Sequence, residues 1–223
     1  MQSFQGYGSN FIKQSGYSPD AFVQMAMQLA TFRLWDGKQA GTYESTQVRP
    51  FLHGRTETTR SVSIESAKFV HRLGVRPAWD EGDASVRKEK LELLQRAVNA
   101  HIKYIGLAAQ AQGVDRHFFG LSLSVQGGEM APDLFKDPVF VRSKRWRVST
   151  SHLTHPKFDG WGFGQVVPDG VGVAYSIHPH HCIFNIAALK EHGWTDKLAQ
   201  LLEESLLELR RLIEADKKPI SKL

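Results

Sequence analysis

The chain has 223 residues, of which 41 % are hydrophobic and 23 % charged, as in a globular protein with a sizeable core. The single cysteine, Cys182, excludes an internal disulfide, and no apolar run is long enough to span a bilayer. The net charge of +5 comes from scattered basic residues rather than from a basic stripe with interleaved aromatics. We therefore expect one domain with no membrane span and no nucleic-acid partner.

The first part of the chain predicts two helices separated by a strand. Residues 1–17 are rich in Gly, Ser, Asn and Gln and are expected to form a loop. Ser-Pro-Asp then opens a helix over residues 18–35, whose apolar residues recur at helical spacing and predict one buried face. β-branched and aromatic residues predict a strand at 41–48, and apolar periodicity predicts a helix at 61–73.

The second part of the chain alternates long helices with strands. The predicted elements are a helix over 84–112, short helical stretches starting at Asp115 and Pro132, strands at 146–151, 170–176 and 182–187, and a leucine-rich helix over 195–215. Helices interleaved with strands predict a two-layer α/β domain, with helices packed on a mixed sheet, over residues 1–216. Residues 217–223 are expected to form a flexible tail.

A dense set of hydroxyls, arginines and glutamates stands out after the first helix. The two motifs are Thr-Tyr-Glu-Ser at 42–45 and Gly-Arg-Thr-Glu-Thr-Thr-Arg at 54–60. The hydroxyls can bind a small polar ligand, or they can cap the turns of a surface hairpin. Arg55 and Arg60 can hold a carboxylate, or they can pair with Glu44 and Glu57.

These motifs resemble the signature of the carnitine/choline acyltransferases, and the chain from Tyr7 to Val173 resembles the C-terminal half of that family. The resemblance implies a CoA-dependent acyltransferase-like fold and reversible transfer of an acyl group between CoA and carnitine. Acyl-CoA and carnitine would be its substrates and partners, with no permanently bound cofactor. The carnitine carboxylate is implied to bind a set of three hydroxyls and one arginine: Tyr43, Ser45, Thr56 and Arg116.

The resemblance also implies roles in thioester chemistry. Ser151, in a Ser-Thr-Ser triplet, is implied to stabilise the oxyanion. CoA is implied to lie against Lys13, Lys103 and the helix that starts at Ser18 and Asp20, because phosphates bind well at a helix N-terminus and beside lysines.

The implied acyl pocket lies in a glycine-rich loop, 160–164. Trp161 and Phe163 are implied to shape this pocket, and a bulky residue there implies a short acyl group. His152 stands beside Ser151 where many family members have glutamine, which changes a neighbouring CoA contact.

None of the ten histidines matches the family's catalytic histidine, which belongs to the N-terminal half. His178, His180 and His181 form the one histidine cluster, which we expect in a loop rather than in a metal site. The general base is therefore expected to be absent from this chain, and a separate N-terminal half would be a further partner. The alternative is a non-catalytic module that binds CoA or carnitine. Either reading predicts an exposed apolar face.

The chain ends in Ser221-Lys222-Leu223, which is the address read by the peroxisomal import receptor. Lys217-Lys218-Pro219 before it is expected to end the preceding helix and free the tail. The sequence therefore predicts the peroxisomal matrix, and otherwise the cytoplasm, as the location.

Overall fold

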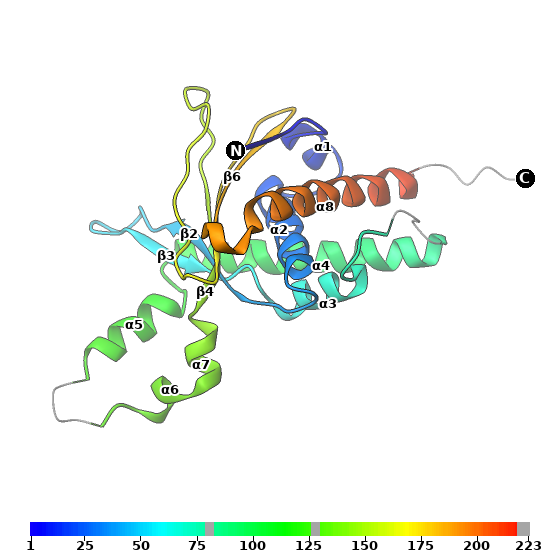
Figure 1. Ribbon diagram of the computed structural model, residues 1–223. Helices are drawn as coiled ribbons and strands as arrows, with labels where there is room; N and C mark the ends of the chain where they lie inside the picture. Colours follow the sequence, from blue (N-terminus) through cyan, green and yellow to red (C-terminus); the bar gives the residue numbers. More distant parts are fainter. Residues whose placement is uncertain (79–82, 126–129, 218–223) are drawn as a thin grey trace, which may run out of the picture.

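The computed structural model describes residues 1–78, 83–125 and 130–217. They form a mixed sheet of six strands with helices packed against it, which confirms the predicted α/β class (Figure 1). The expected targeting tail, Ser221 to Leu223, lies outside the described residues. Within the described ranges, the helices are all too short or too polar to cross a membrane.

The strands follow the order β1-β6-β5-β4-β2-β3 across the sheet. Their bounds are β1 Gln2–Phe4, β2 Gly41–Gln47, β3 Thr56–Thr59, β4 Trp146–His152, β5 Val171–Ile177 and β6 Cys182–Ala187. Strand β4 is parallel to both β2 and β5, and the other neighbours are antiparallel. Because β2, β4 and β5 run in the same direction, their carboxyl ends lie at the same end of the sheet.

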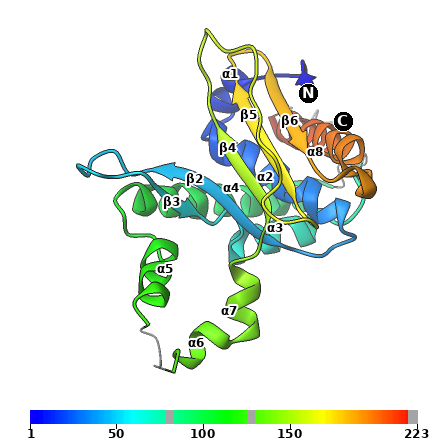
Figure 2. The same cartoon turned by 60° about the vertical axis from the view of Figure 1, so that its left-hand side comes forward.

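Four of the helices cover one face of this sheet (Figure 2). The helix bounds are α1 Ser9–Gln14, α2 Pro19–Leu34, α3 Ile64–Leu73, α4 Ala84–Ala109, α5 Asp115–Leu123, α6 Asp133–Lys136, α7 Pro138–Ser143 and α8 Trp194–Lys217, with a 3-10 turn η1 at Lys190–His192. Figure 2 shows the four, α2, α3, α4 and α8, gathered behind the strands. The expectation of a loop over 1–17 was wrong, because β1 pairs with β6 and α1 follows it.

Helix α2 is the centre of the core. Every residue from Ala21 to Leu34 is buried, so the prediction of one buried face was wrong. The helix packs between the sheet and α8, and Gln24 reaches the sheet by donating to Thr150 Oγ1 at 2.9 Å. A helix enclosed on all sides in this way no longer needs a polar face.

An ion pair joins α2 to α8 inside the core. Arg33 Nη2 lies 2.6 Å from Glu208 Oε2, and the two side chains are 0 % and 2 % exposed. Arg33 also donates to Ser205 Oγ at 3.2 Å and to the Gly74 carbonyl at 3.2 Å. Because both charges are out of water, each depends on the other for its solvation.

We predict that Glu208→Ala strongly destabilises the fold, because it leaves the Arg33 guanidinium buried without its carboxylate. Breaking a buried pair costs about 3–5 kcal/mol, which chemical denaturation would measure. Glu89→Ala is the control, since the Arg72–Glu89 pair is exposed, and exposed pairs contribute about 0–1 kcal/mol. Equal losses in the two variants would contradict this account.

Helices α5, α6 and α7 project away from the sheet beyond the ends of β3 and β4 (Figure 1). They bury none of their residues. Phe119, Leu123 and Val139 are 55 %, 69 % and 76 % exposed. Part of the apolar surface that the described residues expose therefore lies on this projection.

Candidate functional site

The motif-bearing stretch forms an antiparallel hairpin of β2 and β3, in which Ser45 pairs with Thr58 and Gln47 with Thr56. Side chains along β2 alternate, with Glu44 buried against the helices and Tyr43 and Ser45 half-buried. The alternative that this stretch forms a hairpin is therefore confirmed. It does not exclude a binding site, because the hairpin borders a pocket.

That pocket has a volume of about 630 Å³ and lies at the carboxyl ends of β2 and β4. In the parallel pairing of these strands, Glu44 lies opposite Thr150, so Ser45 and Ser151 follow at neighbouring positions. Among the residues that line the pocket are Asp20, Glu44, Ser45, Gln47, Arg49, Thr56, Ser151 and His152. Four residues assigned from sequence to three separate roles, Asp20, Ser45, Thr56 and Ser151, thus meet in one cavity.

Arg116 acts on this pocket through Thr56. Its Nη2 donates to Thr56 Oγ1 at 3.2 Å, and its Nε donates to the Thr56 carbonyl at 3.0 Å. Pairing with Glu44 or Glu57 was one of the two alternatives open for Arg60, and the structure instead shows a two-point pair of Arg60 with Asp115 at 2.8 and 2.9 Å. Arg116 is therefore left to fix the hydroxyl of Thr56.

Tyr43 and the two lysines of the CoA set also lie outside the lining, as do Arg116 and Ser18. The Tyr43 ring packs on Trp146 with centroids 5.9 Å apart, on β2 and β4. Lys13 is exposed at the end of α1, and Lys103 is exposed on α4. The structure thus leaves both lysines open to solvent, away from the pocket lining.

Ser18 occupies the N-cap position of α2 as predicted, but its side chain makes no capping hydrogen bond.

Trp161 and Phe163 lie in the connection between β4 and β5, with ring centroids 5.9 Å apart, and neither lines the pocket. Asn185 Nδ2 donates to the Trp161 carbonyl at 3.0 Å and ties this connection to β6.

A buried charge cluster forms the inner wall of the pocket, and the sequence analysis missed its central residue, His101. His101 Nε2 lies 3.1 Å from Glu44 Oε2 and 3.6 Å from Asp20 Oδ2. It takes the place of an apolar residue in the buried stripe of α4, between Val98 and Ala108. The signal in the sequence was a histidine at a position where the helical periodicity predicts a buried apolar residue.

Asp20 connects this cluster to the pocket. Its Oδ1 accepts a hydrogen bond from the Tyr175 hydroxyl at 2.7 Å and lies 3.1 Å from His152 Nδ1. The His152 ring stacks on Tyr175 with centroids 4.9 Å apart. Thr154 Oγ1 lies 2.7 Å from His152 Nε2 and accepts from the Ile177 amide at 2.8 Å. The two ring nitrogens of His152 are thus placed between Asp20 and Thr154.

The charges of the cluster are set by burial and by the partners. Burial disfavours the charged imidazole of His101, but the neighbouring carboxylates of Asp20 and Glu44 outweigh it and raise its pKa to about 9. Burial raises the pKa of Glu44 to about 7, against the opposing effect of His101. For Asp20, burial is outweighed by the neighbouring imidazoles of His101 and His152 and by the hydrogen bond from Tyr175, which hold its pKa well below the usual range.

Asp20, Glu44 and His101 are also the donor types that a divalent cation takes, with their ligand atoms within 4.8 Å of one another. His101 Nε2 and Glu44 Oε2 lie 3.1 Å apart as an ion pair, although neither atom makes a hydrogen bond of normal geometry within the described residues. The cluster of His178, His180 and His181 lies in the turn between β5 and β6, as expected.

We predict that stability falls as the pH rises from about 5 to 9. Folding raises the pKa of His101 from 6.5 to about 9 and that of Glu44 from 4.5 to about 7, so the folded chain binds more protons in this window. Each rise corresponds to about 3 kcal/mol of stability lost above both pKa values. The double variant Glu44→Gln, His101→Gln lacks both titrating groups. Its free energy of unfolding, measured by denaturation at a series of pH values, should therefore change much less with pH. An unchanged slope would refute the assignment.

The geometry describes a mixed-sheet α/β protein with a polar pocket that serine and threonine hydroxyls line. The family model of choline/carnitine O-acyltransferase matches residues 1–204. The chain is 38 % identical over 223 residues to the mitochondrial carnitine O-acetyltransferase of Saccharomyces cerevisiae (strain ATCC 204508 / S288c), covering 99 % of this chain and 32 % of that protein. It is 35 % identical over 212 residues to the choline O-acetyltransferase of Gallus gallus, covering 94 % and 32 %.

The chain therefore belongs to the choline/carnitine O-acyltransferase family. It spans about a third of the length of the curated relatives it matches. Among solved structures, the wax ester synthase/diacylglycerol acyltransferase from Marinobacter aquaeolei VT8 matches with a TM-score of 0.48 and 13 % identity, over 96 % of this chain and 48 % of that one.

Proposed function

We propose that this chain carries the carnitine site and the oxyanion serine of a carnitine O-acyltransferase. The reaction moves an acyl group reversibly between the sulfur of CoA and the hydroxyl of carnitine. The observation that supports this most strongly is the single 630 Å³ pocket that Ser45, Thr56 and Ser151 line together. Hydroxyls for the acceptor and a hydroxyl for the developing oxyanion are thereby within one cavity.

Carnitine rather than choline is favoured by the charge around Thr56. Arg116 donates to Thr56 Oγ1 at 3.2 Å, and Arg49 lines the same pocket. Carnitine has a carboxylate for these groups to hold, whereas choline has none. Tyr43 and Ser45 share the outer face of β2 and complete the proposed carnitine set.

Acyl-CoA is the proposed second substrate. The exposed amino groups of Lys13 and Lys103 suit its phosphates, and the start of α2 at Ser18 and Asp20 suits the pantetheine arm. Trp161, beside Phe163, favours a short acyl group because its bulk closes space in the β4–β5 connection.

The proton of the carnitine hydroxyl needs a general base, whose contribution is about a hundred- to ten-thousand-fold. No histidine of this sequence matches the family's catalytic histidine. Ser151 stabilises an oxyanion but does not generate the nucleophile. The second candidate function is thus a binding module without catalysis, and it is favoured by this missing base.

An acyl-transfer assay with acetyl-CoA and carnitine tests both functions. We expect the purified chain to bind the two substrates without releasing free CoA above background. Adding the N-terminal part of a full-length relative, as a separate polypeptide, should restore transfer if the parts associate. Carnitine-dependent release of CoA by the chain alone would overturn the need for a second part and would single out His152, which lies beside Ser151 in the pocket. Binding of neither substrate would refute both functions.

In the restored enzyme, Thr56→Val should raise the KM for carnitine far more than the KM for acetyl-CoA. A lost hydrogen bond to a charged group costs about 1.5–3 kcal/mol, or about ten- to over a hundredfold. Thr58→Val is the matched control, because Thr58 is buried in the same strand and does not line the pocket. Equal changes in both KM values would contradict the carnitine assignment.

We also propose that the C-terminal Ser-Lys-Leu directs this protein into peroxisomes through the import receptor. A protein tagged with a fluorophore at its N-terminus should collect in puncta that coincide with a peroxisomal marker. Removing Leu223 should make the signal diffuse. The same distribution with and without Leu223 would rule this proposal out.

A further inference from the structure

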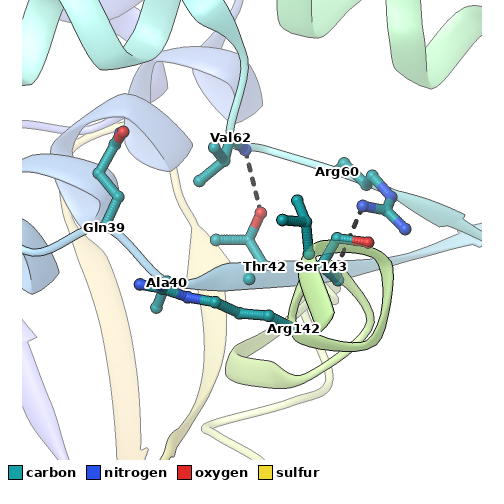
Figure 3. Close-up of a pocket in the computed structure, with 9 residues that line it drawn as sticks. Gln39, Ala40, Thr42, Arg60, Val62, Arg142 and Ser143 are labelled. Atoms are coloured by element: carbon teal, nitrogen blue, oxygen red, sulfur yellow. Dashed lines mark hydrogen bonds between the residues drawn. The ribbon is translucent and has the colours of Figure 1, made fainter. Parts of the chain in front are cut away.

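Two adjoining pockets lie at the opposite, amino-terminal end of β2 and β4. Their volumes are about 350 and 290 Å³. Gln39, Ala40, Gly41 and Arg142 line both, so the two pockets form one recess. Figure 3 shows Arg142 extending from α7 along β2 toward Ala40, and Arg60 donating to the carbonyl of Ser143 at the end of α7.

The recess has an excess of positive charge. Its arginines are Arg60, Arg142, Arg145 and Arg147. Two aspartates face these four cations: Asp115 pairs with Arg60, and Asp169 is shared by Arg145 and Arg147. The difference of four positive and two negative charges leaves the recess at about +2. Burial and the neighbouring arginines lower the pKa of Arg147, as expected where cations crowd.

Several donors in the recess have no acceptor. Arg142 has no acidic partner among the residues that the structure describes. Gln39 Nε2 is buried and has no hydrogen-bond partner there either. Thr42 Oγ1 accepts from the Val62 amide at 3.0 Å, which leaves its own proton to donate into the cavity (Figure 3).

The remaining wall is apolar. Val62, Val139 and Ala40 line the larger pocket beside the arginines. A ligand that fits therefore needs an anionic head and a small apolar body. A phosphate monoester carries nearly two negative charges at neutral pH, and its oxygens accept from guanidinium groups that approach from several directions.

We propose that this recess binds an organic phosphate, with the phosphoryl group at Arg142, Arg145 and Arg147 and the apolar group against Val62 and Val139. The site is separate from the acyl-transfer pocket, because that pocket lies at the carboxyl ends of the same strands. It goes beyond the proposed function, and its test requires no acyl transfer.

Isothermal titration of the chain with phenyl phosphate tests the proposal, with inorganic phosphate and succinate as comparison ligands. We expect phenyl phosphate to bind most tightly, and Arg142→Gln to weaken it about tenfold to a hundredfold. Lys144→Gln is the matched control. It removes the same charge two residues away, where the ammonium lies 4.6 Å from the Phe140 ring centre and lines neither pocket.

Val139→Glu is the second variant. Val139 is 76 % exposed, so folding should tolerate a carboxylate there, while its charge at the recess should abolish phosphate binding. Saturating carnitine, which carries no phosphate, should leave phenyl phosphate binding unchanged. The proposal is overturned if phenyl phosphate does not bind, if succinate binds as tightly, if both variants bind like the parent chain, or if carnitine displaces the ligand.

Discussion

The buried imidazole of His101, held between the carboxylates of Asp20 and Glu44, is the interaction on which the 630 Å³ pocket at the carboxyl ends of β2 and β4 depends. It joins α4, the start of α2 and strand β2 at one point. An imidazolium with two carboxylates within 3.6 Å is stabilised by charge, and each carboxylate is in turn stabilised by it. Because Glu44 lies between Tyr43 and Ser45 in β2, the same contact fixes the position of the strand that carries the proposed carnitine site.

The second constraint is the parallel pairing of β2 with β4. More than a hundred residues separate Ser45 from Ser151 in the chain, and the pairing of Glu44 with Thr150 brings them to the same edge of the sheet. Helix α2 supports this edge from inside, since Gln24 donates to Thr150 Oγ1 and to the Tyr175 hydroxyl. The hydrogen bonds of Gln24 thus connect the core helix α2 to residues beside the pocket. A change that loosens α2 is therefore expected to disturb both.

The two ends of β2 and β4 differ in their electrostatic environment. At their carboxyl ends, the carboxylates of Asp20 and Glu44 stand beside a small set of cations. At their amino ends, arginines outnumber aspartates by two. The fold therefore brings together basic residues that are scattered in the sequence. The residues from Arg142 to Arg147 form the centre of this positively charged group. This gathering was not foreseen from the chain, because Arg60 joins it from another strand end.

The sequence by itself determined the α/β class, most of the element positions and the motifs that predict the carnitine and oxyanion residues. These features are local: periodicity, capping residues and motif spacing are written along the chain. Only the tertiary structure decided that α2 is buried on every side, that Arg60 pairs with Asp115, and that His101 completes the cluster with Asp20 and Glu44. Each of these depends on which distant segments meet, and burial, not residue type, then sets the charge and partners of a side chain.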